Sequence, residues 1–279
     1  MSDFFNLLHP YRIYLGGLWG LLLGSFLNVV IYRLPLMLEQ QWQADTTTPG
    51  SADPSHRSSF NLSTPSSHCP QCQHRLSWWE NLPVVSYLML KGRCRSCHAH
   101  IGWRYPAIEL LTALAMAACF HHWGLSLQAC VWSGLVCTLI TLAVIDWDTT
   151  LLPDQLTQPL LWAGLIAAAL NLSGLWLTDA LWGAVAGYLS LWSVYWIFKR
   201  VTGKEGMGYG DFKLFAALGA WFGWPALIPL ILLASLAGIA VGLVMQSRQQ
   251  LREFQYIPFG PFLAMAAGVY MVWGDTFTR

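Results

Sequence analysis

Long apolar segments dominate this 279-residue sequence and restrict what it can fold into. A helix needs about 20 predominantly apolar residues to cross about 30 Å of hydrocarbon. Seven segments come near that length, at 13–32, 106–123, 127–145, 156–173, 180–198, 225–245 and 260–274. An eighth, 212–222, follows a glycine cluster and is expected to be short, re-entrant or buried. We predict an all-α polytopic membrane protein with about eight transmembrane helices.

The composition supports this class. Only 10% of the residues are charged, 55% are hydrophobic and the mean hydropathy is +0.45. Soluble domains carry about 25% charged residues, so a chain of this kind cannot cover a soluble surface. The net charge of +1 gives no broad basic footprint, and no nucleic-acid partner is expected. The expected surrounding is the lipid bilayer.

The basic residues predict the orientation. The regions 33–105, 199–213 and 246–259 hold 13 of the 15 lysines and arginines, and with eight spans all three fall on one side. Basic loops mark the cytoplasmic face. Only Arg12 and Arg279 fall on the other side, where both termini are expected. No small-residue cleavage site follows the first segment, which we interpret as a retained anchor.

The loop between the first two apolar segments is long enough to contain a domain. We expect an N-terminal transmembrane anchor over 1–32, a cytoplasmic loop over 33–105 and a multi-span domain over 106–279. Residues 44–67 are rich in Ser, Thr, Pro and Asp and are expected to form a flexible insert. The remainder, 68–105, is expected to be a compact module.

This module carries two C-x-x-C knuckles, Cys69 with Cys72 and Cys94 with Cys97, separated by 21 residues. Zinc ribbons usually have about 15–20 residues there. Four thiolates form a closed tetrahedral site for structural Zn²⁺, which leaves no position for catalysis. Two disulfides or free thiols are the alternatives, and disulfides are disfavoured in a reducing cytoplasm. The nearby histidines are expected to be solvated, with replacement of one thiolate as the alternative; they are His68, His74, His98 and His100.

Two aspartates at the predicted cytoplasmic helix edges are candidates for catalysis. Asp146 ends the third span and Asp211 begins the sixth, after Gly206, Gly208 and Gly210. Two close carboxylates share one proton, so one can accept a proton from water while the other polarises a carbonyl. Helix dipoles would favour charge on Asp211 and disfavour it on Asp146. The alternative for Asp211, a helix N-cap, stays open.

Other residues receive structural interpretations. Asp154 is expected to be an N-cap. Asp148 cannot share the helical face of Asp146 and is therefore a weaker catalytic candidate. Glu109 is expected to pair with Arg104 or a loop lysine, with substrate contact as the less supported alternative. A helix-packing stripe is expected on the first segment, formed by Gly16, Gly20, Gly24 and Asn28. Substrate contact is the alternative for Asn28 and for Ser25. The core is expected to contain Cys119, Cys130 and Cys137.

Taken together, these segments resemble the bacterial type IV prepilin peptidases. The resemblance rests on GSFLNVVIYRLP at 24–35, the two knuckles flanking WENLP at 79–83, Arg104 to Glu109, Asp146 with LPD at 152–154, and GYGDFK at 208–213. They occur in family order and cover most of the chain.

The resemblance implies an inner-membrane aspartic protease of the GxGD type. In an inner membrane, the side that the basic residues predict for both termini is the periplasm. Such enzymes remove the basic leader of prepilins and type II secretion pseudopilins at the cytoplasmic face. The implied catalytic pair is Asp146 and Asp211. The resemblance also implies N-methylation of the new N-terminus with S-adenosylmethionine, to which Gly92 is linked as a candidate cofactor-binding position. The residues themselves show no methyl-donor pocket and do not give the oligomeric state.

Two other hypotheses stay open. One is a peptidase without methyl transfer, in which the zinc module docks substrate. The other is a transporter or assembly scaffold, in which the intramembrane acids carry protons and the zinc loop binds a cytoplasmic partner. We find no inverted repeat of the kind that favours transport.

Overall fold

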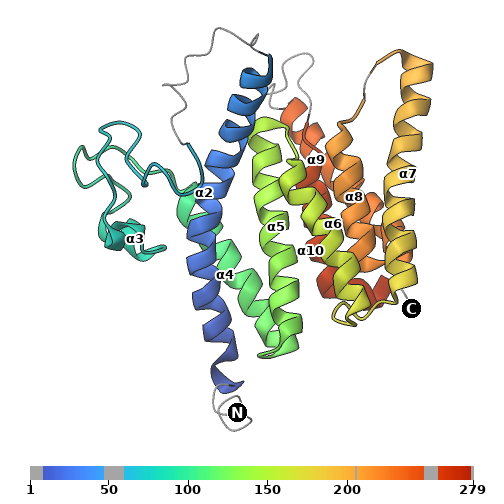
Figure 1. The fold of residues 1–279 in the computed structure, drawn as a ribbon, viewed down its shortest axis with the longest axis horizontal. Helices are drawn as coiled ribbons and strands as arrows, with labels where there is room; N and C mark the ends of the chain where they lie inside the picture. The colour runs from blue at the N-terminus through green and yellow to red at the C-terminus, as the bar shows by residue number, and fades with distance from the viewer. Residues whose placement is uncertain (1–8, 47–59, 205, 248–256, 278–279) are drawn as a thin grey trace. The chain divides into compact units, whose positions relative to one another are not determined.

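The computed structural model describes residues 9–46, 60–204, 206–247 and 257–277 (Figure 1). Within these ranges the regular structure is helical, apart from two isolated β-bridges. The chain divides into two compact units, residues 1–133 and 134–279. Helix α5 (Leu127–Thr149) begins in the first unit and continues into the second.

The first unit is built on the packing of α2 (Arg12–Thr46) against α4 (Arg104–Trp123), after the short helix η1 (His9–Tyr11). The glycine stripe lies in this contact: a Cβ on Gly20 would stand 2.6 Å from Ala113 Cα. The Asn28 side chain donates a hydrogen bond to the Tyr105 carbonyl at 3.2 Å. The predicted packing role of the stripe is confirmed, and Asn28 serves as its polar contact.

Helix α2 is longer than the sequence predicts. It was expected to end before Arg33 and Pro35, but it continues through Pro35 to Thr46. A single proline removes one helical hydrogen bond, while Leu34 and Leu38 remain buried on either side and hold the helix in place. Arg33 is buried as well, and donates to the carbonyls of residues 61, 62 and 65 at 2.9, 3.3 and 2.7 Å. It therefore attaches the loop to α2.

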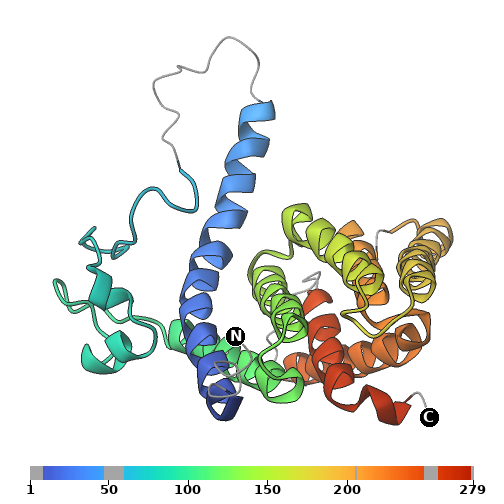
Figure 2. The same ribbon diagram turned by 60° about the horizontal axis from the view of Figure 1, so that its bottom comes forward.

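The second unit surrounds one short, buried helix. Helix α8 (Tyr209–Phe222) packs against α7 (Leu177–Thr202) and α6 (Asp154–Ala169), as Figure 2 also shows. Nearly every side chain from Asp211 onward in α8 is buried, which confirms one of the three expectations for segment 212–222. Gly183 and Gly219 allow α7 and α8 to meet backbone to backbone, because a Cβ on either would overlap the other. The short helix η4 (Trp224–Ala226), α9 (Leu227–Ser247) and α10 (Gly260–Phe277) complete the unit.

All eight predicted apolar segments contain a helix, although the helix in 156–173 ends at Ala169. Among the residues that the structure describes, four stretches are long and apolar enough to cross a membrane, at His9–Asp45, Leu127–Thr149, Leu177–Thr202 and Trp224–Ser247. The total of eight spans, the orientation and the division at 32 and 105 remain predictions. Several residues used to predict the orientation and the insert lie outside the described residues; these are Arg57, Arg248, Arg252, Arg279 and segment 47–59.

Candidate active site and metal centre

The two predicted catalytic aspartates lie in the same unit. Asp146 is on the last turns of α5 and Asp211 is the third residue of α8, and both are buried. The negative charge of Asp146 acts on the Asp211 carboxyl, so the two groups are close enough to interact. Asp211 is not the N-cap of α8, because Gly208 occupies that position. The alternative N-cap role for Asp211 is therefore wrong.

A third element, which the sequence reasoning missed, holds Asp146. The backbone N–H of Gly260, the first residue of α10, donates to Asp146 Oδ2 at 2.9 Å. A Cβ on Gly260 would stand 2.7 Å from the same oxygen. Glycine at this position therefore allows the positive end of the α10 dipole to approach the carboxylate. The signal in the sequence that could have pointed to this contact was a glycine between Phe259 and Pro261 at the start of an apolar segment.

Leu152 lies close to residues that adjoin both carboxyl groups. Its side chain lies 2.7 Å from the position of a Cβ on Gly210, next to Asp211, and 3.2 Å from that of a Cβ on Gly260. The two glycines thus leave room for one leucine between them. Among the described residues nothing hydrogen-bonds Asp211 Oδ1, although this atom is buried. One oxygen of the pair is therefore available to a ligand or to a shared proton.

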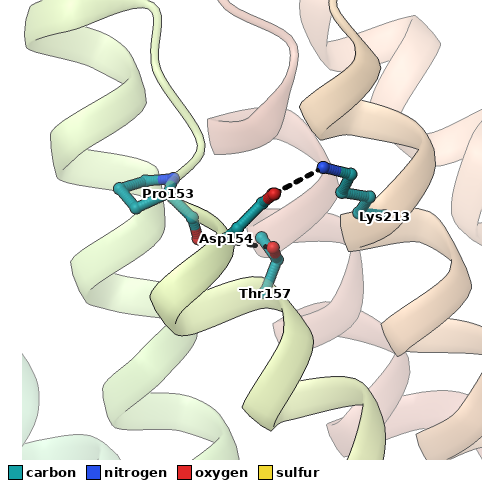
Figure 3. A network of polar contacts seen from close by, with 4 residues as sticks. All are labelled: Pro153, Asp154, Thr157 and Lys213. Carbon is teal, nitrogen blue, oxygen red and sulfur yellow. Dashed lines mark hydrogen bonds and ion pairs between the residues drawn. The ribbon is translucent and has the colours of Figure 1, made fainter. Parts of the chain in front are cut away.

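Asp154 has a different role from the predicted one. Pro153 is the N-cap of α6, and Asp154 is the first residue of the helix. Both carboxylate oxygens of Asp154 accept from Lys213 Nζ at 2.7 Å, and Thr157 Oγ1 donates to the Pro153 carbonyl at 3.3 Å (Figure 3). The N-cap prediction for Asp154 is wrong: the residue links α6 to α8 through an exposed ion pair.

The four predicted metal ligands come together in the first unit. The Sγ atoms of Cys69, Cys72, Cys94 and Cys97 all lie within 4.8 Å of one another. Cys69 and Cys97 are 3.8 Å apart, and Cys72 and Cys94 are 3.9 Å apart. Tetrahedral Zn–S bonds of about 2.3 Å require sulfur separations of about 3.8 Å. The cluster fits zinc, and among the described residues it includes no histidine.

The two knuckles have the same local structure. In each, the first cysteine N–H donates to the carbonyl five residues later, at His74 and Ala99. The residue four positions after that cysteine has positive φ, 59° at Gln73 and 58° at His98. One β-bridge flanks each knuckle, His68 with Arg75 and Arg93 with His100. This repeated turn aims both thiols of each pair at a common point.

The cluster has the protonation behaviour expected of metal ligands. Hydrogen bonds from the backbone, chiefly the N–H of Cys72, lower the pKa of the Cys69 thiol to about 7. At Cys97 the Ala99 N–H favours the thiolate, but burial and the three neighbouring cysteines outweigh it and raise the pKa to about 11. Four thiolates therefore do not coexist near neutral pH without a cation, and metal binding displaces protons.

A buried acid stiffens the segment between the knuckles. Glu80 lies in the short helix η3 (Trp78–Asn81), where its Oε2 accepts from the Ser77 N–H at 2.7 Å. That hydrogen bond holds the pKa of Glu80 below its usual value, and His74 adds to the effect at 3.4 Å. The residue is therefore a structural carboxylate.

Gly92 has a clear conformational role. It is buried with φ +66°, and a Cβ there would stand 3.0 Å from the Tyr87 ring. Its N–H donates to the Tyr87 carbonyl and its carbonyl accepts from Ile101. Tyr87 lies on helix α3 (Val85–Met89), so Gly92 fixes the connection from α3 to the second knuckle.

Two further expectations need correction. Glu109 was expected to pair with Arg104 or a loop lysine, but its Oε2 accepts the Val84 N–H at 2.8 Å and so attaches the module to α4. Cys119 and Cys137 are buried as expected, whereas Cys130 is exposed. The sequence placed the three cysteines in apolar segments, but it did not show which face of its helix each cysteine occupies.

Sequence comparison identifies the family. Residues 18–123 match the bacterial peptidase A24 N-terminal domain, and residues 133–243 match the type IV leader peptidase family. A prepilin leader peptidase/N-methyltransferase of Pseudomonas aeruginosa is 52% identical over 265 residues, covering 94% of this chain and 90% of that protein. The chain belongs to the type IV leader peptidase family. The predicted family resemblance is confirmed.

Other relatives of the family give the same result. Proteins of the same name from Stutzerimonas stutzeri and Aeromonas salmonicida are each 51% identical, over 263 and 271 residues. The two alignments cover 93% and 94% of this chain, and 90% and 91% of the respective relatives. No solved structure matches the chain.

Proposed function

We propose that the protein is a membrane aspartic endopeptidase that removes the leader from type IV prepilins and type II secretion pseudopilins, with Asp146 and Asp211 as the catalytic pair. The observation that carries this proposal is the burial of two interacting carboxyl groups on α5 and α8, one of them fixed by the Gly260 N–H. The names of the relatives supply the substrate class.

The contacts suggest distinct roles for the two aspartates. A hydrogen bond from an N–H at a helix start stabilises a carboxylate, so Asp146 is the ionised partner that takes a proton from water. Asp211, whose Oδ1 lacks a partner among the described residues, holds the proton that polarises the scissile carbonyl. Water then attacks the carbonyl carbon, and the amine leaves with a proton. This assignment is the opposite of the expectation from the sequence, in which the helix dipoles favour charge on Asp211 and disfavour it on Asp146.

The proposed setting follows from the predicted topology. The protein lies in the bacterial inner membrane, with the zinc module and the aspartate pair at the cytoplasmic face and both termini periplasmic. The basic leader of the substrate would reach the carboxylates from the cytoplasm, and opposite charge favours that encounter. Four thiolates from Cys69, Cys72, Cys94 and Cys97 would hold a structural Zn²⁺ that keeps the module folded.

N-methylation of the new N-terminus is the second proposed activity, with S-adenosylmethionine as methyl donor. The pocket beside Gly92 includes Lys91, Arg93 and Arg95 in its lining and no carboxylate. It does not fit a donor that carries sulfonium and ammonium charges. Gly92 is therefore proposed to support methylation by fixing the shape of the module.

Intact-mass analysis of a co-expressed prepilin tests both activities. Loss of the leader plus one methyl group is expected, and both signals should disappear with Asp146→Asn or Asp211→Asn. Asp148→Asn is the matched control, because Asp148 is exposed on the same helix as Asp146. Leader loss without methylation would leave a peptidase alone. An unchanged precursor with folded wild-type enzyme would favour the transporter or scaffold.

A further inference from the structure

The cysteine module exposes more apolar surface than a small domain in water normally tolerates. Trp78, Val85, Leu88 and Met89 are 79%, 50%, 68% and 68% exposed. Val85, Leu88 and Met89 belong to α3, and Trp78 begins η3. We call these four residues the apolar face of the module. Exposed apolar clusters on a small domain mark contact with a partner or a membrane.

A hydrogen bond and a close helix contact attach this face to the predicted first span. Arg12 and Arg33 lie about 32 Å apart along α2, close to the thickness of the hydrocarbon layer. Glu109, which binds the Val84 N–H at the start of α3, packs with its Cα 2.8 Å from the position of a Cβ on Gly24. Gly24 is nine residues before Arg33, about 13 Å nearer the other end of the span.

The position of α3 in the first unit agrees with these contacts. Figure 1 shows α3 to one side of α2, level with the middle of that helix and well short of its C-terminal end. Exposed aromatic residues occur nearby at the start of α4, where Trp103 and Tyr105 are 77% and 48% exposed. Tryptophan and tyrosine concentrate at the boundary between lipid and water.

A cationic pocket adjoins the apolar face. It has a volume of about 490 Å³, and Met89, Lys91, Arg93 and Arg95 are among its lining residues, which include no carboxylate. The Arg95 guanidinium lies over the Trp79 ring at 5.0 Å, which holds that side chain in place. An occupant must therefore be anionic where it meets the pocket and apolar where it meets α3.

We propose that this surface docks on the membrane and binds an anionic phospholipid, with the headgroup phosphate in the pocket and α3 against the acyl chains. A phospholipid combines both chemistries in one molecule, and clustered cations beside a membrane helix favour acidic lipids. A cationic peptide, such as the leader of the proposed substrate, has the wrong sign for this pocket. The proposal needs no substrate and stands apart from the proteolytic activity.

Photocrosslinking from α3 tests the proposal in the zinc-loaded full-length protein. Leu88→p-benzoylphenylalanine, or the same change at Met89, is placed in nanodiscs of phosphatidylcholine with or without phosphatidylglycerol. The expected product is a lipid adduct by mass, more abundant with phosphatidylglycerol. Lys91→Gln/Arg93→Gln should lower its yield about fivefold for each cation removed, because a cation near an acidic surface contributes about 1 kcal/mol.

Controls separate lipid binding from loss of folding or charge. Arg200→Gln/Lys204→Gln removes two exposed cations outside the module and should leave the adduct unchanged. Zinc content and monodispersity identify variants that fold. A crosslink from α3 to a peptide of residues 134–279 would overturn the proposal and make the face a contact within the chain. An adduct of equal yield in both membranes, insensitive to Lys91 and Arg93, would overturn the assignment to anionic lipid.

Discussion

The cysteine module and the aspartate pair both bring groups of like charge together, but the chain supports them differently. The four thiols lie on two solvent-facing turns, and Cys72 and Cys97 are exposed. The aspartates are buried among helices that meet at glycines such as Gly183 and Gly219. A metal ion can hold the first arrangement, whereas packing and the hydrogen bond from the Gly260 N–H hold the second. Thiols on short turns thus depend on solution conditions in a way that buried carboxylates do not.

Disrupting the glycine contact should have the largest effect. Gly219→Val would place side-chain atoms in the α7 backbone and destabilise the second unit by about 3 kcal/mol. Leader cleavage should disappear, while the zinc content of the purified protein stays at one per chain. Thermal unfolding followed by proteolysis of residues 134–279 would measure this. Zinc loss in parallel with cleavage would show that the two regions depend on each other.

Zinc removal tests the opposite dependence, that of the aspartate pair on the cysteine module. Chelation should unfold the module, since a site of this kind is formed only with its metal, and protease sites should open within 68–105. The described contacts of the aspartate pair come from residues 152–260, so leader cleavage should fall by less than about tenfold. Methylation should be lost. Cleavage rates before and after zinc is restored would decide whether the pair needs the module.

The pH dependence of zinc binding should sharpen the contrast. Zinc binds thiolates, so each protonated thiol must lose its proton, and affinity must fall as pH falls. With the pKa of Cys97 near 11, at least one proton is displaced at pH 8, which gives about tenfold per pH unit. Zinc affinity should fall more steeply below pH 7, where Cys69 is also protonated. Competition with a coloured chelator from pH 6 to 8 measures this; a flat profile would contradict it.

Gly260→Ala tests how the aspartate pair is positioned. The added Cβ would crowd Asp146 Oδ2, so leader cleavage should fall about tenfold or more, mainly in kcat, with zinc binding unchanged. Gly268→Ala is the matched control on the same helix, because a Cβ there meets no atom within 4 Å among the described residues. Equal rates for the two variants would remove Gly260 from the site.

The smallest effect is expected at the exposed ion pair. Asp154→Asn should change stability by less than about 1 kcal/mol and cleavage by less than about threefold, because solvent screens Lys213 and Asp154. Steady-state rates beside those of Asp146→Asn would measure it. A loss as large as that of Asp146→Asn would place Asp154 in the catalytic machinery.

The sequence predicted those features that depend on local patterns. The lengths of the apolar segments predicted where the long helices lie, and the spacing of the cysteines predicted that the four thiols cluster. It missed the contacts between distant segments: the Gly260 N–H, 114 residues from Asp146, the Leu152 side chain and the Glu109 bond to Val84. It also ended the first helix at residue 32, ahead of Pro35, because local propensity does not reveal the packing that keeps a proline inside a helix.

The bond from Gly260 to Asp146 has a consequence for biosynthesis. The ribosome completes α5 and α8 well before it reaches α10, so a growing chain carries both aspartates without the amide that orients one of them. The site is therefore completed only when α10, the last described helix, packs against the rest of the unit. The order of synthesis thus delays full proteolytic competence until α10 has been made.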